Sequence, residues 1–242
     1  MANDAWCLSV NTEPFQWTKL VCQGDIPLPR VYHSAGRIQS GIATGMIVVF
    51  GGRKGGSKQS ALSDVWGLRK HRSGVWDWVK APQEPNNPMI KPRYQHSALF
   101  LGSLMIIVGG RASDIPESLP LDIYDTEKNE WVNQKCIQRF RHIAFMYDDS
   151  LFIHGGFEQE NPSTPIPKIH RINLIGAFKS NPILKEKISN FIVSFGSPHP
   201  SRSNSPVGTP DMSPTRSRKQ PPQPSSGQNR SKKYSNPRIQ SV

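Results

Sequence analysis

Cysteine is scarce in this sequence: only three of the 242 residues are cysteines, at positions 7, 22 and 136. They lie far apart, their number is odd and none belongs to a CxxC pair. This excludes a disulfide framework and a zinc site of the usual spacing. A reduced chain in the cytoplasm, with the nucleus as the alternative location, is the simplest expectation.

Long hydrophobic runs are also missing. The longest apolar stretches have five or six residues, which is far short of the roughly 20 that a membrane-spanning helix needs. The first ten residues, MANDAWCLSV, contain neither the basic segment nor the apolar segment of a secretory signal. We therefore expect no membrane association.

Acidic residues are few, with 18 against 30 lysines and arginines, and the formal net charge is +12. The excess is uneven, because the stretch from Ser197 to Val242 holds eight basic residues and a single acid, Asp211. The positive charge is thus mainly a property of this tail. It does not indicate a nucleic-acid-binding domain, although binding of RNA or an anionic surface by the tail remains an alternative.

A double glycine recurs three times, each time at the end of a short apolar run. The pairs are Gly51–Gly52, Gly109–Gly110 and Gly155–Gly156. Upstream of each pair an arginine stands three residues before a histidine, in Arg30–His33, Arg93–His96 and Arg139–His142. Glycine suits a position where the chain turns sharply and a Cβ would clash.

Each copy predicts short β-strands in a fixed order. One strand begins at the histidine, a second runs into the glycine pair and a third follows a polar loop. In the first two copies a fourth strand carries a tryptophan. Repeats of this length and content are typical of β-propeller blades. Bulky aromatic residues at one fixed position fill the space between neighbouring blades, and this packing role is predicted for Trp17, Trp78 and Trp131.

These elements resemble kelch repeats over about residues 1–174. Four segments are similar in detail to the propeller of plant and protist kelch-containing Ser/Thr phosphatases: Asn3–Leu8, Gly24–Arg30, Leu62–Leu68 and Pro92–Ser97. The resemblance implies an all-β partial kelch propeller that acts as a non-catalytic protein-interaction module. The alternative is a fragment or relative of such a phosphatase that serves as its regulatory or substrate-binding part.

The sequence departs from the phosphatases in its chemistry. The metal-site motifs GDxHG, GDxxDRG and GNHE are absent, so we expect neither an enzyme nor a metal or cofactor. His33, His96 and His142 occupy the same position in successive repeats, which places them in separate blades rather than around one ion. The repeated Asp4, Asp64 and Asp122 are expected to cap turns.

The number of repeats is also unusual. The pattern predicts two strands, then four, four and three, or about three blades plus half a blade. Closed propellers have about four to eight blades. Either the chain is a truncated portion of a longer product, which we favour, or another half-propeller completes the ring.

Arginines mark the predicted partner-binding face. The resemblance implies that arginines at the start of the first strand and directly after the glycine pair receive an acidic or phosphorylated peptide from a protein partner. A guanidinium can hold a carboxylate or phosphate through two hydrogen bonds. Alternatively, these side chains bond neighbouring backbone carbonyls or loop acids. The candidates are Arg30, Arg53, Arg93, Arg111 and Arg139.

Residues 175–196 form a linker with a short amphipathic helix, capped by Asn181, that either covers a propeller surface or docks on a partner. Residues 197–242 are Ser/Pro-rich and basic, and such a composition predicts disorder. Arg218–Pro224 matches an SH3-ligand pattern. Phosphates on the Ser/Thr-Pro sites would offset the tail's positive charge. The candidate sites are Ser197, Ser205, Thr209 and Ser213.

Overall fold

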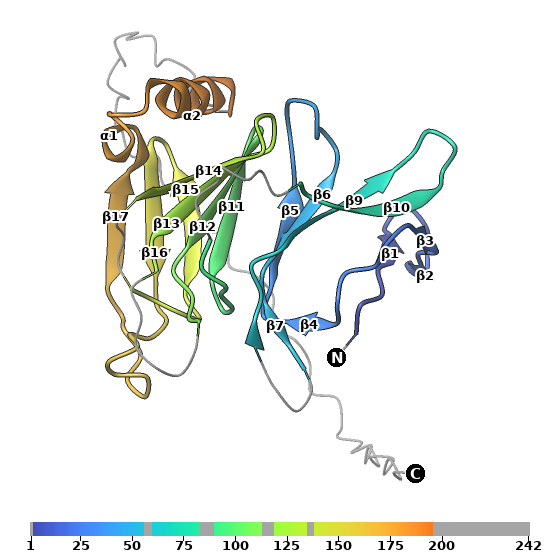
Figure 1. Cartoon of the computed structure of the whole chain (residues 1–242), viewed down its shortest axis with the longest axis horizontal. Coiled ribbons are helices and arrows are strands. Elements are labelled where there is room, and N and C mark those ends of the chain that lie inside the picture. Colours follow the sequence, from blue (N-terminus) through green and yellow to red (C-terminus); the bar gives the residue numbers. More distant parts are fainter. Residues whose placement is uncertain (1, 56–59, 83–89, 113–118, 135–137, 196–242) are drawn as a thin grey trace, which may run out of the picture. The chain divides into compact units, whose positions relative to one another are not determined.

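The computed structural model describes residues 2–55, 60–82, 90–112, 119–134 and 138–195. Its strands form several small sheets that follow one another along the chain (Figure 1). The predicted all-β architecture is confirmed, with two helices at the end of the described region. The predicted tail of residues 197–242 and Cys136 lie outside the described residues.

Blade 2 is a four-stranded antiparallel sheet whose strands pair in sequence order. It consists of β11 (Ser97–Leu101), β12 (Leu104–Val108), β13 (Leu121–Asp125) and β14 (Glu130–Gln134). Every residue of β12 and β13 is buried. Both faces of a strand can be buried only when the sheet is covered on both sides, so blade 2 lies between two neighbours.

Blades 1 and 3 are those neighbours. Blade 1 contains β5 (Ser34–Arg37), β6 (Ile47–Phe50), β9 (Val65–Lys70) and β10 (Trp76–Lys80), and β3 (Cys22–Gln23) pairs in parallel with β10. Blade 3 contains β15 (Ile143–Tyr147), β16 (Ser150–His154) and β17 (Ile169–Asn173). The first strand of each blade contacts that of the next, β5 with β11 and β11 with β15. This is the arrangement of propeller blades.

The apolar side chains between blades form two clusters. Val48 and Phe50 of blade 1 pack with Met105 and Ile107 of blade 2. On the opposite face of blade 2, Ile106 and its neighbours pack with Leu151 and Ile153 of blade 3. Alternation along each strand therefore sends successive side chains into different junctions.

The N-terminal half-blade is a hairpin of β1 (Trp6–Ser9) and β2 (Gln16–Lys19). Its predicted core residue is an exception, because Trp17 is 65% exposed. Trp131 does pack as predicted, with its ring 5.4 Å from Phe50 and 4.9 Å from Tyr124, and Trp78 is half-buried. Among the described residues the hairpin has no further strands beside it, so Trp17 lacks the surface that a complete blade provides.

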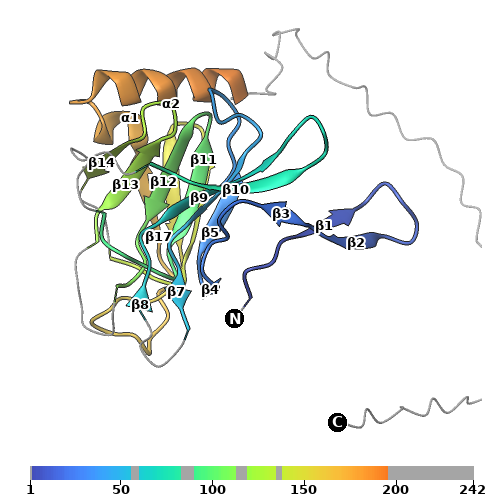
Figure 2. The same ribbon diagram turned by 45° about the vertical axis from the view of Figure 1, so that its right-hand side comes forward.

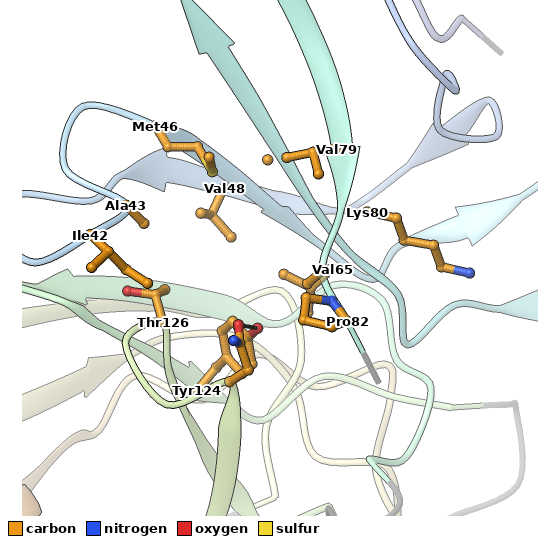
Figure 3. Close-up of a pocket in the computed structure, with 13 residues that line it drawn as sticks. Ile42, Ala43, Met46, Val48, Val65, Val79, Lys80, Pro82, Tyr124 and Thr126 are labelled. Carbon is orange, nitrogen blue, oxygen red and sulfur yellow. Dashed lines mark hydrogen bonds between the residues drawn. The ribbon is translucent and has the colours of Figure 1, made fainter. Parts of the chain in front are cut away.

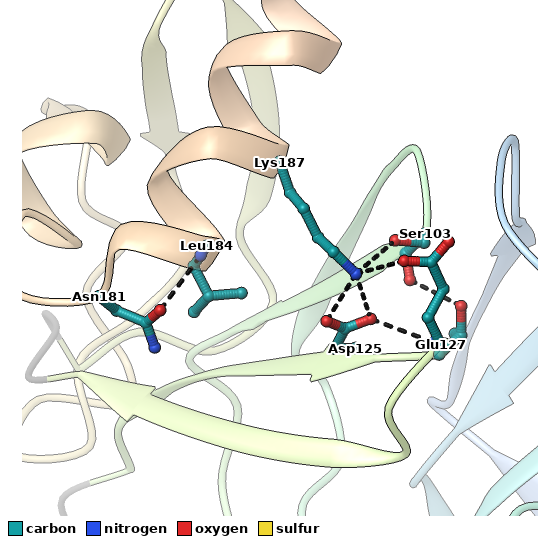
Figure 4. Close-up of polar contacts among 7 residues, drawn as sticks. Ser103, Asp125, Glu127, Asn181, Leu184 and Lys187 are labelled. Carbon is teal, nitrogen blue, oxygen red and sulfur yellow. Dashed lines mark hydrogen bonds and ion pairs between the residues drawn. The ribbon is translucent and has the colours of Figure 1, made fainter.

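The C-terminal helices cover one end of blades 2 and 3, as Figures 1 and 2 show. They are α1 (Leu174–Ala177) and α2 (Pro182–Phe195). The Asn181 side chain accepts a hydrogen bond from the backbone of Leu184 and caps α2 as predicted (Figure 4). No helix in the described part of the chain is long and apolar enough to cross a membrane.

Two kinds of contact fix α2 in place. Leu184 and Ile188 are buried in the cluster between blades 2 and 3. On the neighbouring side of the helix, the Lys187 ammonium lies 2.8 Å from Asp125 and also bonds Glu127, both on blade 2 (Figure 4). Burial alone would lower the pKa of Lys187, but these carboxylates raise it, so Lys187 stays charged over the whole neutral range.

The docking of α2 can be tested by shortening its buried side chain. We expect Ile188→Ala to lower the free energy of unfolding by about 2–5 kcal/mol, because it leaves a cavity in a fully buried site. Val193→Ala is the matched control, since Val193 lies on the same helix and is exposed. Urea unfolding of both variants gives the comparison, and equal small losses would mean that α2 is not docked.

Candidate partner-binding face

The arginine–histidine segment and the glycine pair meet in every blade. The residue after the arginine forms a β-bridge with the residue after the glycine pair. In blade 1 this bridge extends into an unpredicted small sheet of β4 (Arg30–Val31), β7 (Arg53–Lys54) and β8 (Ser60–Ala61). The bridged pairs are Val31 with Arg53, Tyr94 with Arg111, and Phe140 with Phe157.

The glycine pairs also join neighbouring blades. Gly51 has φ +62°, and a Cβ there would stand 2.8 Å from the Arg93 carbonyl oxygen of the next blade. Gly52 N–H donates to that same oxygen at 2.9 Å, and Gly110 N–H donates to the Arg139 carbonyl at 2.7 Å. The repeat therefore needs glycine because the next blade's backbone comes so close.

A second set of backbone bonds follows the same direction. The N–H of Gln95 donates to the Tyr32 carbonyl at 3.1 Å, and the N–H of Arg141 donates to the Gln95 carbonyl at 3.0 Å. Each of these three residues directly precedes the histidine of its repeat and has a positive φ between 55° and 59°. A left-handed conformation is uncommon for residues other than glycine. Here these residues form backbone hydrogen bonds with the neighbouring blade.

Arg30, Arg93 and Arg139 are buried, and their burial removes them from the candidate partner-binding residues. Arg30 holds both carboxylate oxygens of Asp64, at 2.7 and 2.8 Å, and the Gly51 carbonyl. Arg93, which is fully buried, likewise bonds Asp122 and the Gly109 carbonyl. These guanidiniums connect the glycine turn to the third strand, so they stabilise the blade.

Blade 3 repeats this arrangement without the acid. Arg139 donates to the carbonyls of Gly155 and Lys168. Lys168 stands at the spacing from the glycine pair at which blades 1 and 2 have Asp64 and Asp122. Asp64 and Asp122 are therefore ion-pair partners of the arginines rather than turn caps, and only two of the three blades have this pair. Asp4, the third repeated aspartate, instead accepts a hydrogen bond from the Trp6 ring and pairs with Lys19.

The repeated histidines lie in separate blades, as predicted. His96 and His142 are buried where the preceding blade's glycine pair covers them, whereas His33 is exposed. Burial, together with the charge of Arg93, lowers the pKa of His96 to about 3. Burial and Arg139 lower the pKa of His142 to about 4. Within the described residues no three His, Cys, Asp or Glu side chains gather as metal ligands.

The two remaining candidates, Arg53 and Arg111, are half-buried beside aromatic rings. The Arg53 guanidinium lies 5.3 Å from the centre of the Tyr94 ring. Arg111 lies 5.8 Å from the same ring and 4.8 Å from the Phe140 ring. The ring faces attract the cations, and Tyr94 contacts both guanidiniums. We call Arg53, Tyr94, Arg111 and Phe140 the arginine–aromatic row.

Tyr94 and Phe140 were not among the predicted site residues. Their signal is in the sequence, since both directly follow the arginine of the repeat. What the pattern does not reveal is that an arginine of one blade rests on the aromatic ring of the next. That contact depends on how far the blades are rotated against each other.

A second feature is an apolar groove of about 180 Å³ between blade 1 and the end of β13 (Figure 3). Its wall is mostly aliphatic, so it suits an apolar side chain rather than an ion. Its polar lining comes from Tyr124 and Asn129, which bond each other at 2.9 Å, and from Lys80 and Thr126. The labelled apolar residues include Ile42, Met46, Val48, Val65 and Val79.

The family model that describes the KLHDC2/KLHL20/DRC7 kelch-repeats domain matches residues 1–175. The chain belongs to the kelch-repeat family. Kelch-repeat domains are generally protein-binding modules. The match covers all three blades, and the region that it matches is the kelch domain alone.

Two curated relatives that match this chain are much longer proteins. Serine/threonine-protein phosphatase BSL2 of Arabidopsis thaliana is 29% identical over 180 residues, covering 63% of this chain and 17% of the relative. Tip elongation aberrant protein 1 of Schizosaccharomyces pombe is 29% identical over 170 residues, covering 66% and 14%. This kelch chain thus spans about a sixth of the length of these relatives.

A solved structure supports the kelch fold. The chain superposes on the structure of YjhT with a TM-score of 0.55 and 13% identity, covering 71% of this chain and 57% of that one. At this identity the likeness concerns the fold alone. The predicted partial kelch propeller is therefore confirmed.

Proposed function

We propose that this kelch chain is a non-catalytic interaction module that binds an acidic or phosphorylated segment of a protein partner along the arginine–aromatic row. The position of two guanidiniums beside one ring is the observation that supports this. Both guanidiniums lie within reach of the same ring, at 5.3 and 5.8 Å from its centre, so an anion that binds beside this ring is attracted by both cations. A carboxylate or phosphate also matches the hydrogen-bonding geometry of arginine.

An array of acidic peptides, each made with serine, phosphoserine and alanine at one position, tests the proposal. We expect the double variant Arg53→Ala/Arg111→Ala to bind the best peptide at least about 10-fold more weakly, because each lost charge-assisted bond contributes about 1.5–3 kcal/mol. Fluorescence anisotropy at two salt concentrations measures the affinities, and the binding should weaken as salt rises.

Arg69→Ala is the matched control, because Arg69 is an exposed arginine that pairs with Asp77 on the outer strands of blade 1. It should bind the peptide like the unaltered protein. Arg53→Lys keeps the charge but loses the paired donors, so intermediate binding is expected. Equal binding by the double variant and the unaltered protein would refute the role of the row.

A second candidate function follows from the similarity to the phosphatase. Here the chain would serve as the regulatory or substrate-binding part of a Ser/Thr phosphatase. The 29% identity to BSL2 over 180 residues favours it. Co-purification of a Ser/Thr phosphatase catalytic chain with this protein, lost in the double variant and kept in Arg69→Ala, would support this role.

A further inference from the structure

The two junctions between blades share one contact. In each, the first glycine of the pair faces the arginine carbonyl and the histidine ring of the following blade, Gly51 with Arg93 and His96, and Gly109 with Arg139 and His142. The inner strand of the following blade packs its alanine, Ala98 or Ala144, into the junction. One blade offers a glycine side and the next an arginine–histidine side.

Blade 3 has a glycine side without a blade against it. Gly155, the counterpart of Gly51 and Gly109, has no described atom within 4 Å of its Cβ position. On the same face Ile143 is 59% exposed, Phe145 41% and Tyr147 62%, although the corresponding Leu99 and Leu101 of blade 2 pack against blade 3. Phe145 stacks on Phe152 and extends this apolar surface.

Blade 1 has the complementary arginine–histidine side, also uncovered. His33 is exposed, whereas its counterparts His96 and His142 are buried by the preceding blade. Ala35 on β5 is exposed as well, in the position at which blades 2 and 3 pack Ala98 and Ala144. Arg37, two residues further on, is also exposed. β3, which follows the N-terminal hairpin in the chain, pairs at the opposite edge of this sheet from β5.

We propose that the uncovered face of blade 3 binds the β5 side of blade 1 in a second copy of this chain, so that two copies associate head to tail. The two surfaces are the two halves of a contact that the chain already makes twice. A head-to-tail contact closes when the rotation allows it. Two copies with three described blades each would supply six, within the range of about four to eight blades in closed propellers.

The third junction would differ from the other two in one respect. Ile143 stands where blade 1 has Ser34, which is hydrogen-bonded to His96 at 2.8 Å, and where blade 2 has Ser97, which donates to the His142 carbonyl. The junction between copies would lack this hydroxyl and depend more on apolar contact. This fits Phe145 and Tyr147, which present their rings on the same face.

Sedimentation velocity and light scattering of the full chain, over a range of concentrations at native salt, test the proposal. We expect a species of twice the chain mass. Ile143→Glu and Ala35→Glu each place a charge in one half of the junction, at positions exposed in the single chain, so both variants should remain folded and become monomeric. Far-ultraviolet circular dichroism checks the folding.

A mixture of the two variants is the decisive measurement. Ile143→Glu keeps an intact blade 1 side and Ala35→Glu an intact blade 3 side, so one sound junction can form between them. Mixing should restore dimers that neither variant forms alone. Val193→Glu is the control, because Val193 is exposed on α2. This variant should form dimers like the unaltered protein.

A monomer at all concentrations would overturn the proposal, as would a dimer that survives Ile143→Glu or a mixture that stays monomeric. Larger assemblies would mean that the contact forms without closing. The contact is separate from the arginine–aromatic row, so Arg53→Ala/Arg111→Ala should remain dimeric. Loss of peptide binding and loss of the dimer therefore report on different proposals.

Discussion

Replacing Arg93 by methionine should lower the free energy of unfolding by about 3–5 kcal/mol, because it leaves the buried carboxylate of Asp122 without its counter-charge. Arg93 and Asp122 are both almost completely inaccessible to water. Arg93 also donates to the carbonyls of Gly109 and Pro120, and methionine has no donor for either. Urea unfolding monitored by tryptophan fluorescence measures the loss.

Arg69→Met provides the comparison for this variant. The Arg69–Asp77 pair has a similar charge geometry, at 2.6 Å, but the Arg69 side chain is 47% exposed. Exposed pairs contribute between about 0 and 1 kcal/mol. If both methionine variants lost the same small amount, the Arg93 side chain would not be buried in solution and its assignment to the blade interior would be wrong.

Acidification from about pH 7 to about pH 5 should lower the free energy of unfolding by about 2 kcal/mol for each of His96 and His142. Their pKa values in the folded chain are lowered to about 3 and about 4. Below the usual histidine pKa of about 6.5 the unfolded chain takes up protons that the folded chain does not. Stability is therefore unaffected above this value and falls with pH below it.

Urea unfolding at a series of pH values checks this dependence. His142→Gln should reduce the acid-induced loss by about 2 kcal/mol, because glutamine does not titrate, whatever its effect at neutral pH. His154→Gln is the control for the substitution itself, since His154 is exposed on β16. An unchanged slope in His142→Gln would show that His142 is protonated as readily in the folded state as in the unfolded one.

The strands, the glycine turns and the capped helix could be predicted because each follows from local chemistry. Gly51 and Gly109 need a positive φ and room for the next backbone, so no other residue type serves there. Asn181 followed by Pro182 gives the helix its start. The two-residue strands β4, β7 and β8 were missed, because pairs this short have no period to detect.

The roles of side chains at repeated positions could not be predicted, because they depend on the neighbouring blade. An arginine at the start of a strand can point to solvent, where it could bind a partner, or into the blade. Only the fold shows that Arg30 points inward and bonds Asp64. His33 and His96 share one motif position, yet a blade covers only the second. Trp17 and Trp131 differ for the same reason.

The backbone bonds that connect Tyr32, Gln95 and Arg141 run in one direction through successive blades. Each blade is therefore bonded only to its immediate neighbours. The stability of such a one-dimensional array is the sum of the stability of each blade and the energy of each interface between neighbours. Blade 2 takes part in both interfaces and the outer blades in one each. The unfolding of blade 2 must therefore be the most strongly coupled to that of the other blades. Closing the array into a ring would give every blade two neighbours.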